Sequence, residues 1–183
     1  MYNMTKRVNV LDMVYIAMFA VLIAICSWIY IPTAVPFTLQ TFAVFAAVGI
    51  LGGKRGTIAV GVYILLGAIG VPVFAQFQSG FGVLFGFSGG YILGFLFAVL
   101  LYWLITHIFG AKIVPMAIAM ILGLFVCYTF GTVWFMYVFS HSKGPVGLLT
   151  ALGWCVFPFV IPDLVKIVLA ILLSKRLSKY VGR

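Results

Sequence analysis

Residues 10–29 read VLDMVYIAMFAVLIAICSWI, an apolar run in which Asp12 is the only charged residue. A helix of about 20 such residues is long enough to span the hydrocarbon core of a bilayer. The run is too long for the apolar part of a secretory signal and contains no A-x-A cleavage pattern, so we interpret it as a retained first span.

The rest of the chain has the same apolar character. Hydrophobic residues make up 66% of the 183 residues and charged residues only 7%, with a mean hydropathy of +1.30. A water-soluble domain is nearer half apolar and could not bury this much apolar surface. The net charge of +9 does not indicate nucleic-acid binding, because the cations lie in short clusters between apolar runs.

Six apolar runs predict an all-α, polytopic membrane protein with six transmembrane helices in a single domain over residues 1–183. The charged stretch 52–56 is expected to be a tight turn. The glycine-interrupted stretch 71–90 is expected to be irregular and packed against protein, because bare backbone cannot face lipid. The expected helices cover, approximately, residues 10–29, 42–51, 57–69, 91–109, 113–139 and 162–180.

The cations predict the orientation of these helices. With the N-terminus in the cytoplasm, nine cations outside the spans fall on the cytoplasmic side and only Lys143 falls outside. This asymmetry is the positive-inside pattern, so both termini are expected to be cytoplasmic. The nine cations are Lys6, Arg7, Lys54, Arg55, Lys112, Lys175, Arg176, Lys179 and Arg183.

Two ionisable residues lie inside the sixth run. Asp163 and Lys166 are three residues apart, which places them on one helix face. An ionisable residue in a span costs roughly 2.5–3.5 kcal/mol on insertion scales, and such residues usually face a cavity or a partner. Pro162 is expected near the first helical position, so that Asp163 lies at the outer end of the helix. The pair either neutralises itself and holds the helix end, or binds a polar ligand.

Further polar and aromatic residues are expected on the same outer side. Glutamine offers both a donor and an acceptor, which suits an amide-like or urea-like solute, and aromatic rings could enclose its apolar part. The candidates are Thr38, Gln40, Thr41, Gln76, Gln78, Ser79, Ser88, Phe37, Phe74, Tyr91 and Trp154. No catalytic residue and no metal site is expected, since the sequence has only two acids, no CxxC and no nucleotide-binding motif.

Small residues occur four apart in the first run, at Ala20 and Ala24. This spacing lets another helix approach closely. The neighbouring helix could belong to the same chain or to a partner.

Four stretches occur in order along nearly the whole chain: VPFTLQTF at 35–42, LGAIGVPVFA at 66–75, GFSGGY at 86–91 and PDLVK at 162–166. Together they resemble the BioY family, the biotin-specific S components of energy-coupling factor transporters. The resemblance implies a six-helix, non-enzymatic subunit of the bacterial plasma membrane that captures biotin from outside. It also implies a transmembrane T component and two ATPases as partners. ATP is then used by these partners, and the chain itself carries no cofactor.

In that reading Ala20 and Ala24 dock on the T component. The expected ligand contacts are Asp163, Lys166, Gln40, Phe37, Phe74, Gln76, Gly89 and Tyr91. Two alternatives remain open: an S component for another vitamin such as thiamin or riboflavin, and a stand-alone transporter that uses Asp163 as its proton site.

Overall fold

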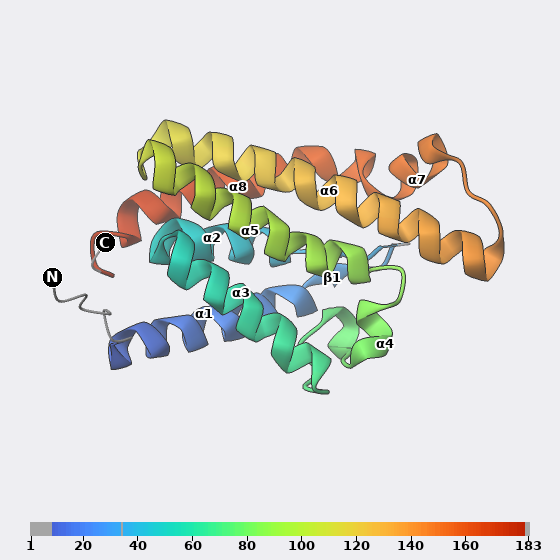
Figure 1. The fold of residues 1–183 in the computed structure, drawn as a ribbon, viewed down its shortest axis with the longest axis horizontal. Coiled ribbons are helices and arrows are strands. Elements are labelled where there is room, and N and C mark those ends of the chain that lie inside the picture. Colours follow the sequence, from blue (N-terminus) through green and yellow to red (C-terminus); the bar gives the residue numbers. More distant parts are fainter. Residues whose placement is uncertain (1–8, 34, 182–183) are drawn as a thin grey trace, which may run out of the picture.

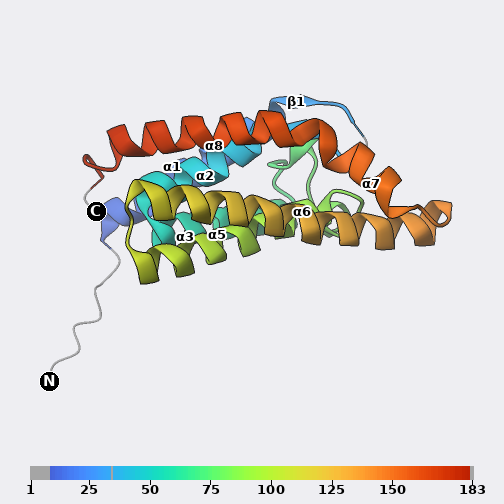
Figure 2. The ribbon, with the colours of Figure 1, turned by 90° about the horizontal axis from the view of Figure 1, so that it is seen from above.

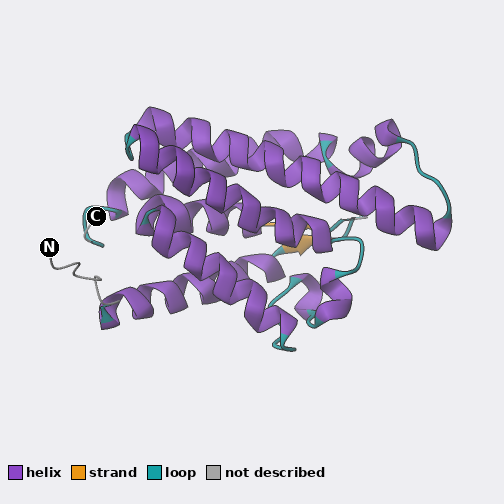
Figure 3. Cartoon of the chain, in the orientation of Figure 1, coloured by secondary structure: helices purple, strands orange, loops and turns teal. Residues whose placement is uncertain are grey.

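The computed structural model describes residues 9–33 and 35–181, and most of them are helical (Figure 1). Figure 3 shows that helices make up nearly all of the described part of the chain, in which strand structure is confined to one small pair. The elements in chain order are α1 (Val10–Trp28), β1 (Tyr30–Ile31), β2 (Phe37–Thr38), α2 (Gln40–Leu51), α3 (Gly53–Ala68), the 3-10 turn η1 (Ala75–Phe77), α4 (Phe81–Leu84), α5 (Gly89–Phe109), α6 (Ile113–Lys143), α7 (Leu148–Cys155) and α8 (Phe157–Leu177).

Within the described residues, four helices are long and apolar enough to cross a membrane, namely α1, α5, α6 and α8. The shorter helices α2 and α3 are joined by Gly52 alone, whose φ of 84° lies in the left-handed region that glycine adopts without a steric penalty. Figure 2 shows two layers, with α1, α2 and α8 in one and α3, α5 and α6 in the other.

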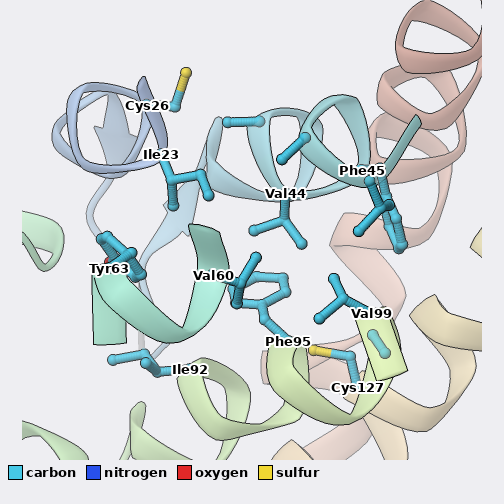
Figure 4. Packing of buried hydrophobic residues seen from close by; sticks show 14 of the residues in the cluster. Ile23, Cys26, Val44, Phe45, Val60, Tyr63, Ile92, Phe95, Val99 and Cys127 are labelled. Carbon is cyan, nitrogen blue, oxygen red and sulfur yellow. The ribbon is translucent and has the colours of Figure 1, made fainter. Parts of the chain in front are cut away.

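The core lies between these layers. Ile23 of α1, Val44 of α2, Val60 of α3 and Val99 of α5 are completely buried and point toward one another (Figure 4). Because lipid tails are as apolar as these side chains, close packing rather than exclusion from water holds such helices together. Gly56 shows how closely α3 packs on α2, since a Cβ there would lie 2.5 Å from the backbone of Val48.

The predicted irregular segment is confirmed in outline. Residues 71–88 form turns, η1 and the single-turn helix α4, and they lead into α5. The small antiparallel pair of β1 and β2, in which Tyr30 pairs with Thr38, adds two short strands to a fold expected to be all-α. This pair closes the connection between α1 and α2.

Two predicted boundaries were wrong. Lys54 and Arg55 lie within α3 rather than in a turn, because Gly52 by itself reverses the chain. Helix α8 begins at Phe157 and ends at Leu177, so Pro162 lies inside it and Asp163 is beyond the first turn. Pro158 takes the early position that suits proline, and the missing N–H of Pro162 is tolerated as it often is in membrane helices.

Candidate functional site

A cavity lies where five parts of the chain meet: the β2–α2 segment, the irregular segment 71–88, α5, α6 and the region from α7 into α8. Most of its lining is apolar or aromatic. Its polar lining residues include Thr38, Gln40, Gln78, Tyr91, Tyr128 and Asp163. An apolar cavity with a few converging polar groups is the usual form of a small-molecule site.

Asp163 is the charged group of this lining, and its carboxylate is held at both oxygens. The Tyr128 hydroxyl on α6 donates to Oδ2 at 2.5 Å, and Lys166 Nζ donates to Oδ1 at 2.7 Å. The Asp163 residue is only 4% exposed. A buried carboxylate needs such donors, because an unpaired charge in a low-dielectric interior is very costly. The two bonds fix the carboxylate plane and leave its remaining lone pairs available to a ligand.

Lys166 joins α8 to the β2 strand. Its Nζ donates to the backbone carbonyl of Thr38 at 2.7 Å and lies 3.8 Å from the centre of the Phe37 ring. The Phe37 ring stacks in turn on Phe159, with centroids 5.1 Å apart. These contacts satisfy the ammonium group with partners from the chain itself. Among the described residues, Asp163 belongs to the cavity lining, whereas Lys166 and Phe37 do not.

Gln40 begins α2, is separated from the β2 strand by Leu39, and is 4% exposed. Its backbone N–H donates to the Thr38 hydroxyl at 3.2 Å, which fixes the start of the helix. Its side-chain Nε2 is buried and lies beside the buried hydroxyl of Tyr63.

Phe74 and Tyr91 form walls of the cavity. Phe74 is completely buried and meets Tyr63 edge-on at 5.6 Å. Its place depends on Gly67, because a Cβ there would lie 2.1 Å from the Phe74 ring. The Tyr91 hydroxyl shares a hydrogen bond of 2.9 Å with the Thr132 hydroxyl. Both rings are therefore fixed by contacts outside the cavity.

The irregular segment is attached to the end of α1. Ser27 donates to the carbonyl of Val73 at 2.5 Å, and Trp28 Nε1 donates to the carbonyl of Pro72 at 3.1 Å. Trp28 also stacks on Phe77, with centroids 4.8 Å apart. These contacts hold the wall that carries Phe74 against the first helix.

Besides Lys166 and Phe37, two more of the expected ligand contacts, Gln76 and Gly89, lie away from the cavity lining. Gln76 has a left-handed φ of 61°, is exposed, and faces a shallower neighbouring recess with Thr33 and Phe87. Gly89 has a packing role, since a Cβ there would lie 1.7 Å from the carbonyl oxygen of Leu84. This close approach sets the angle at which α5 leaves the irregular segment.

The predicted docking residues Ala20 and Ala24 are buried in the structure. Ala20 and Ala24 are 2% and 4% exposed, and α1 packs against α2 and α3. Their small side chains let helices of the same chain approach closely, which is the alternative of packing within the chain. They are covered by this chain's own helices in this structure, and their docking on a T component stays a prediction.

Sequence reasoning missed Tyr128, the aromatic wall residues Phe95 and Phe159, and the two cysteines that line the cavity, Cys127 and Cys155. A phenol in the middle of an apolar run was a usable signal for Tyr128. The others are indistinguishable from ordinary core residues in the sequence. No group of three metal-binding side chains occurs among the described residues.

The comparisons with known proteins point in one direction. The model of the BioY family matches residues 4–183. The chain is 39% identical over 162 residues to the "Biotin transporter BioY" of Thermotoga maritima, covering 88% of this chain and 92% of that protein. It is 34% identical over 166 residues to the "Biotin transporter BioY2" of Lactococcus lactis, covering 90% and 88%.

A solved structure shows the same fold. It is described as the S-component for biotin from an ECF-type ABC transporter, and it matches with a TM-score of 0.84 and 29% sequence identity. The match covers 96% of this chain and 95% of that one.

Proposed function

The chain belongs to the BioY family, and from this premise we propose that it binds biotin as the S component of an energy-coupling factor transporter in the cell membrane. The relatives described above are named as biotin transporters, and the structural match is an S-component for biotin. The chain is a transport subunit and not an enzyme.

The observation that carries this function is the fixed Asp163 carboxylate in an otherwise mostly apolar cavity. Biotin has a cyclic urea with two N–H donors, an apolar thioether ring and an aliphatic chain that ends in a carboxylate. An ionised carboxylate accepts hydrogen bonds and cannot donate them, so it suits the urea N–H groups. The rings of Phe74, Tyr91 and Phe95 suit the apolar ring system.

For the topology we propose a single domain with six spans, α1, α2, α3, α5, α6 and α8, and both termini in the cytoplasm. Figure 1 shows the start of α1, the α2–α3 turn, the α5–α6 turn and the end of α8 at one end of the bundle. Lys54, Arg55, Lys112 and Lys175 belong to these helix ends, whereas Lys143 ends α6 at the other end. This separation supports a cytoplasmic end by the positive-inside rule. Lys6, Arg7 and Arg183 lie outside the described residues.

The cavity lies toward the end opposite these cations, because β2, the irregular segment and the α7–α8 junction line it. Biotin would therefore enter from outside the cell. We propose that a transmembrane T component and two ATPases complete the transporter, that they use the ATP, and that the chain itself needs no cofactor.

Titration of the purified chain with biotin, followed by calorimetry, tests the proposal. We expect saturable binding at micromolar biotin or below, and at least tenfold weaker binding to Asp163→Asn, which removes the negative charge but keeps the shape. A competition panel with thiamin and riboflavin should leave biotin bound. Absence of saturable biotin binding, or displacement by another vitamin, would overturn the assignment. Uptake driven by a pH gradient in vesicles that contain this chain alone would favour the proton-coupled alternative.

A further inference from the structure

The end of α6 carries a lysine that has no acidic side chain to pair with. The sequence contains only two acids, and both are paired elsewhere, Asp12 with Arg55 and Asp163 with Lys166. Lys143 is exposed and is the last residue of α6, where the negative end of the helix dipole favours a cation. Among the described residues, the other lysines and arginines apart from Lys166 belong to the opposite end of the bundle.

The length of α6 places this lysine in water. The helix has 31 residues, which at about 1.5 Å per residue is roughly 46 Å, whereas the hydrocarbon core of a bilayer is about 30 Å thick. Figure 1 shows α6 extending past the end of α5 at the end of the bundle opposite the termini. In the proposed topology the last turns of α6 therefore project from the outer face of the membrane, where a dissolved ligand arrives.

Aromatic rings hold the ammonium group of Lys143 in place. Its Nζ lies 5.6 Å from the centre of the Phe87 ring and 5.8 Å from that of Phe139, within the range of cation–π attraction. The two rings lie 5.8 Å apart, and Trp154 of α7 packs on Phe139 with centroids 5.9 Å apart. An aromatic ring attracts the ammonium group without neutralising its charge, so the positive charge stays available to an anion.

Phe87 connects this lysine to the ligand cavity. The Phe87 side chain also lines the shallow recess beside the cavity, the one that Gln76 faces. The recess and the cavity adjoin, because four wall residues belong to both, namely Pro36, Gln78, Val83 and Ser88. Lys143 therefore lies beside a route that leads from the outer surface through the recess to the cavity.

We propose that Lys143 is a capture residue, which draws the carboxylate of an anionic ligand to the recess before the ligand enters the cavity. The proposal rests on the function proposed above and deepens it. Biotin carries one negative charge at neutral pH, because an alkyl carboxyl group has a pKa of roughly 4–5. A charge at the rim of a site acts chiefly on the rate of association, since it raises the local concentration of the oppositely charged ligand.

The association rate constant of biotin tests this role. It is measured by stopped-flow tryptophan fluorescence of the purified chain in a neutral detergent. At 10 mM ionic strength, where the Debye length is about 30 Å, we expect association about three- to fivefold slower for Lys143→Gln and about tenfold slower for Lys143→Glu. The native rate should fall toward that of Lys143→Gln in 1 M salt, where the Debye length is about 3 Å. Lys143→Arg should keep the native rate.

Biotinamide, in which a neutral carboxamide replaces the carboxylate, separates charge from shape. Its association rate should be the same for the native chain, Lys143→Gln and Lys143→Glu, and independent of salt. Lys112→Gln is the matched control, because it removes an exposed cation from the other end of the same helix. This control should bind biotin at the native rate.

Native association rates in Lys143→Glu would overturn the proposal. An equal slowing of biotin and biotinamide would overturn it as well, because Lys143 would then act through its packing on the rings and not through its charge. If Lys143→Glu does not fold, the ratio of the rates of Lys143→Arg and Lys143→Gln decides in the same way, and equal rates reject the role. Failure of the native chain to bind biotin at all is a different outcome, which refutes the proposed function itself.

Discussion

Lys166→Met removes one charge of the buried pair while keeping a long, unbranched side chain. The Asp163 carboxylate then keeps the Tyr128 hydroxyl as a donor but loses the ammonium 2.7 Å away. The carbonyl of Thr38 loses its donor and the Phe37 ring loses its cation. Breaking a buried pair from one side costs about 3–5 kcal/mol, because a charge is left uncompensated.

The burial of the pair supports a cost within that range. The Lys166 and Asp163 side chains are 8% and 5% exposed, so water can do little to replace the lost partner. For chains of 150–250 residues, 1 kcal/mol corresponds to roughly 2–4 °C in the midpoint of thermal unfolding. We therefore expect a decrease of about 6–20 °C, measured by tryptophan fluorescence of the purified protein in detergent, in the absence of biotin.

The double variant Asp163→Asn with Lys166→Met separates the charge effect from lost packing. Removing both charges leaves no uncompensated ion, and such replacements are often close to neutral. The double variant should therefore unfold at a higher temperature than Lys166→Met alone, although it lacks more native groups. If Lys166→Met unfolds within about 2 °C of the native chain, or if the double variant is less stable than both single variants, the pair does not stabilise the fold as argued.

Three further substitutions test other contacts of the site and the packing around it. Tyr128→Phe should weaken biotin binding about tenfold or more, since a hydrogen bond to a charged group contributes about 1.5–3 kcal/mol. In the double variant with Asp163→Asn it should cause little further loss of affinity, and additive losses by calorimetry would show that the two residues act independently. Gly89→Ala should lower the unfolding temperature, because its Cβ would lie 1.7 Å from a backbone oxygen. Gly82→Ala is the control, since a Cβ there meets no atom within 4 Å, and equal stability of the two variants would refute the packing argument. Ala24→Leu should destabilise the isolated chain by about 1–3 kcal/mol through overpacking, measured in the same unfolding assay, and native stability would indicate that this face is open to a partner.

The general fold was predictable because bilayer spans leave a strong signal. The apolar runs located the helices, and the glycines of residues 71–90 indicated an irregular segment, which the structure confirms. The start of α8 could not be predicted in the same way. Pro158 and Pro162 each suit the first turn of a helix, and only tertiary packing decides that the helix begins before Pro158 and continues through Pro162.

The site was only partly predictable, for a related reason. Asp163 and Gln40 stood out because polar residues are rare in this chain, and both line the cavity. The role of Lys166 depends on the β2 strand, whose carbonyl at Thr38 is 128 residues away in the sequence. Ala20 and Ala24 carry a pattern that is equally typical of internal and external packing, and the sequence could not show that α2 and α3 pack against α1 and that both side chains are buried.

The polar groups of the site also explain how a charged residue is tolerated in a mostly apolar cavity. Asp163 and Lys166 neutralise each other, and Tyr128, the Thr38 carbonyl and the Phe37 ring take up further interactions of the two charges. The energetic cost of burying the pair is therefore largely offset within the chain, and ligand binding does not have to supply it. A fixed acceptor of this kind lowers the conformational cost of binding. Affinity then depends on the ligand's fit to the apolar walls and on its hydrogen bonds to the fixed Asp163 carboxylate.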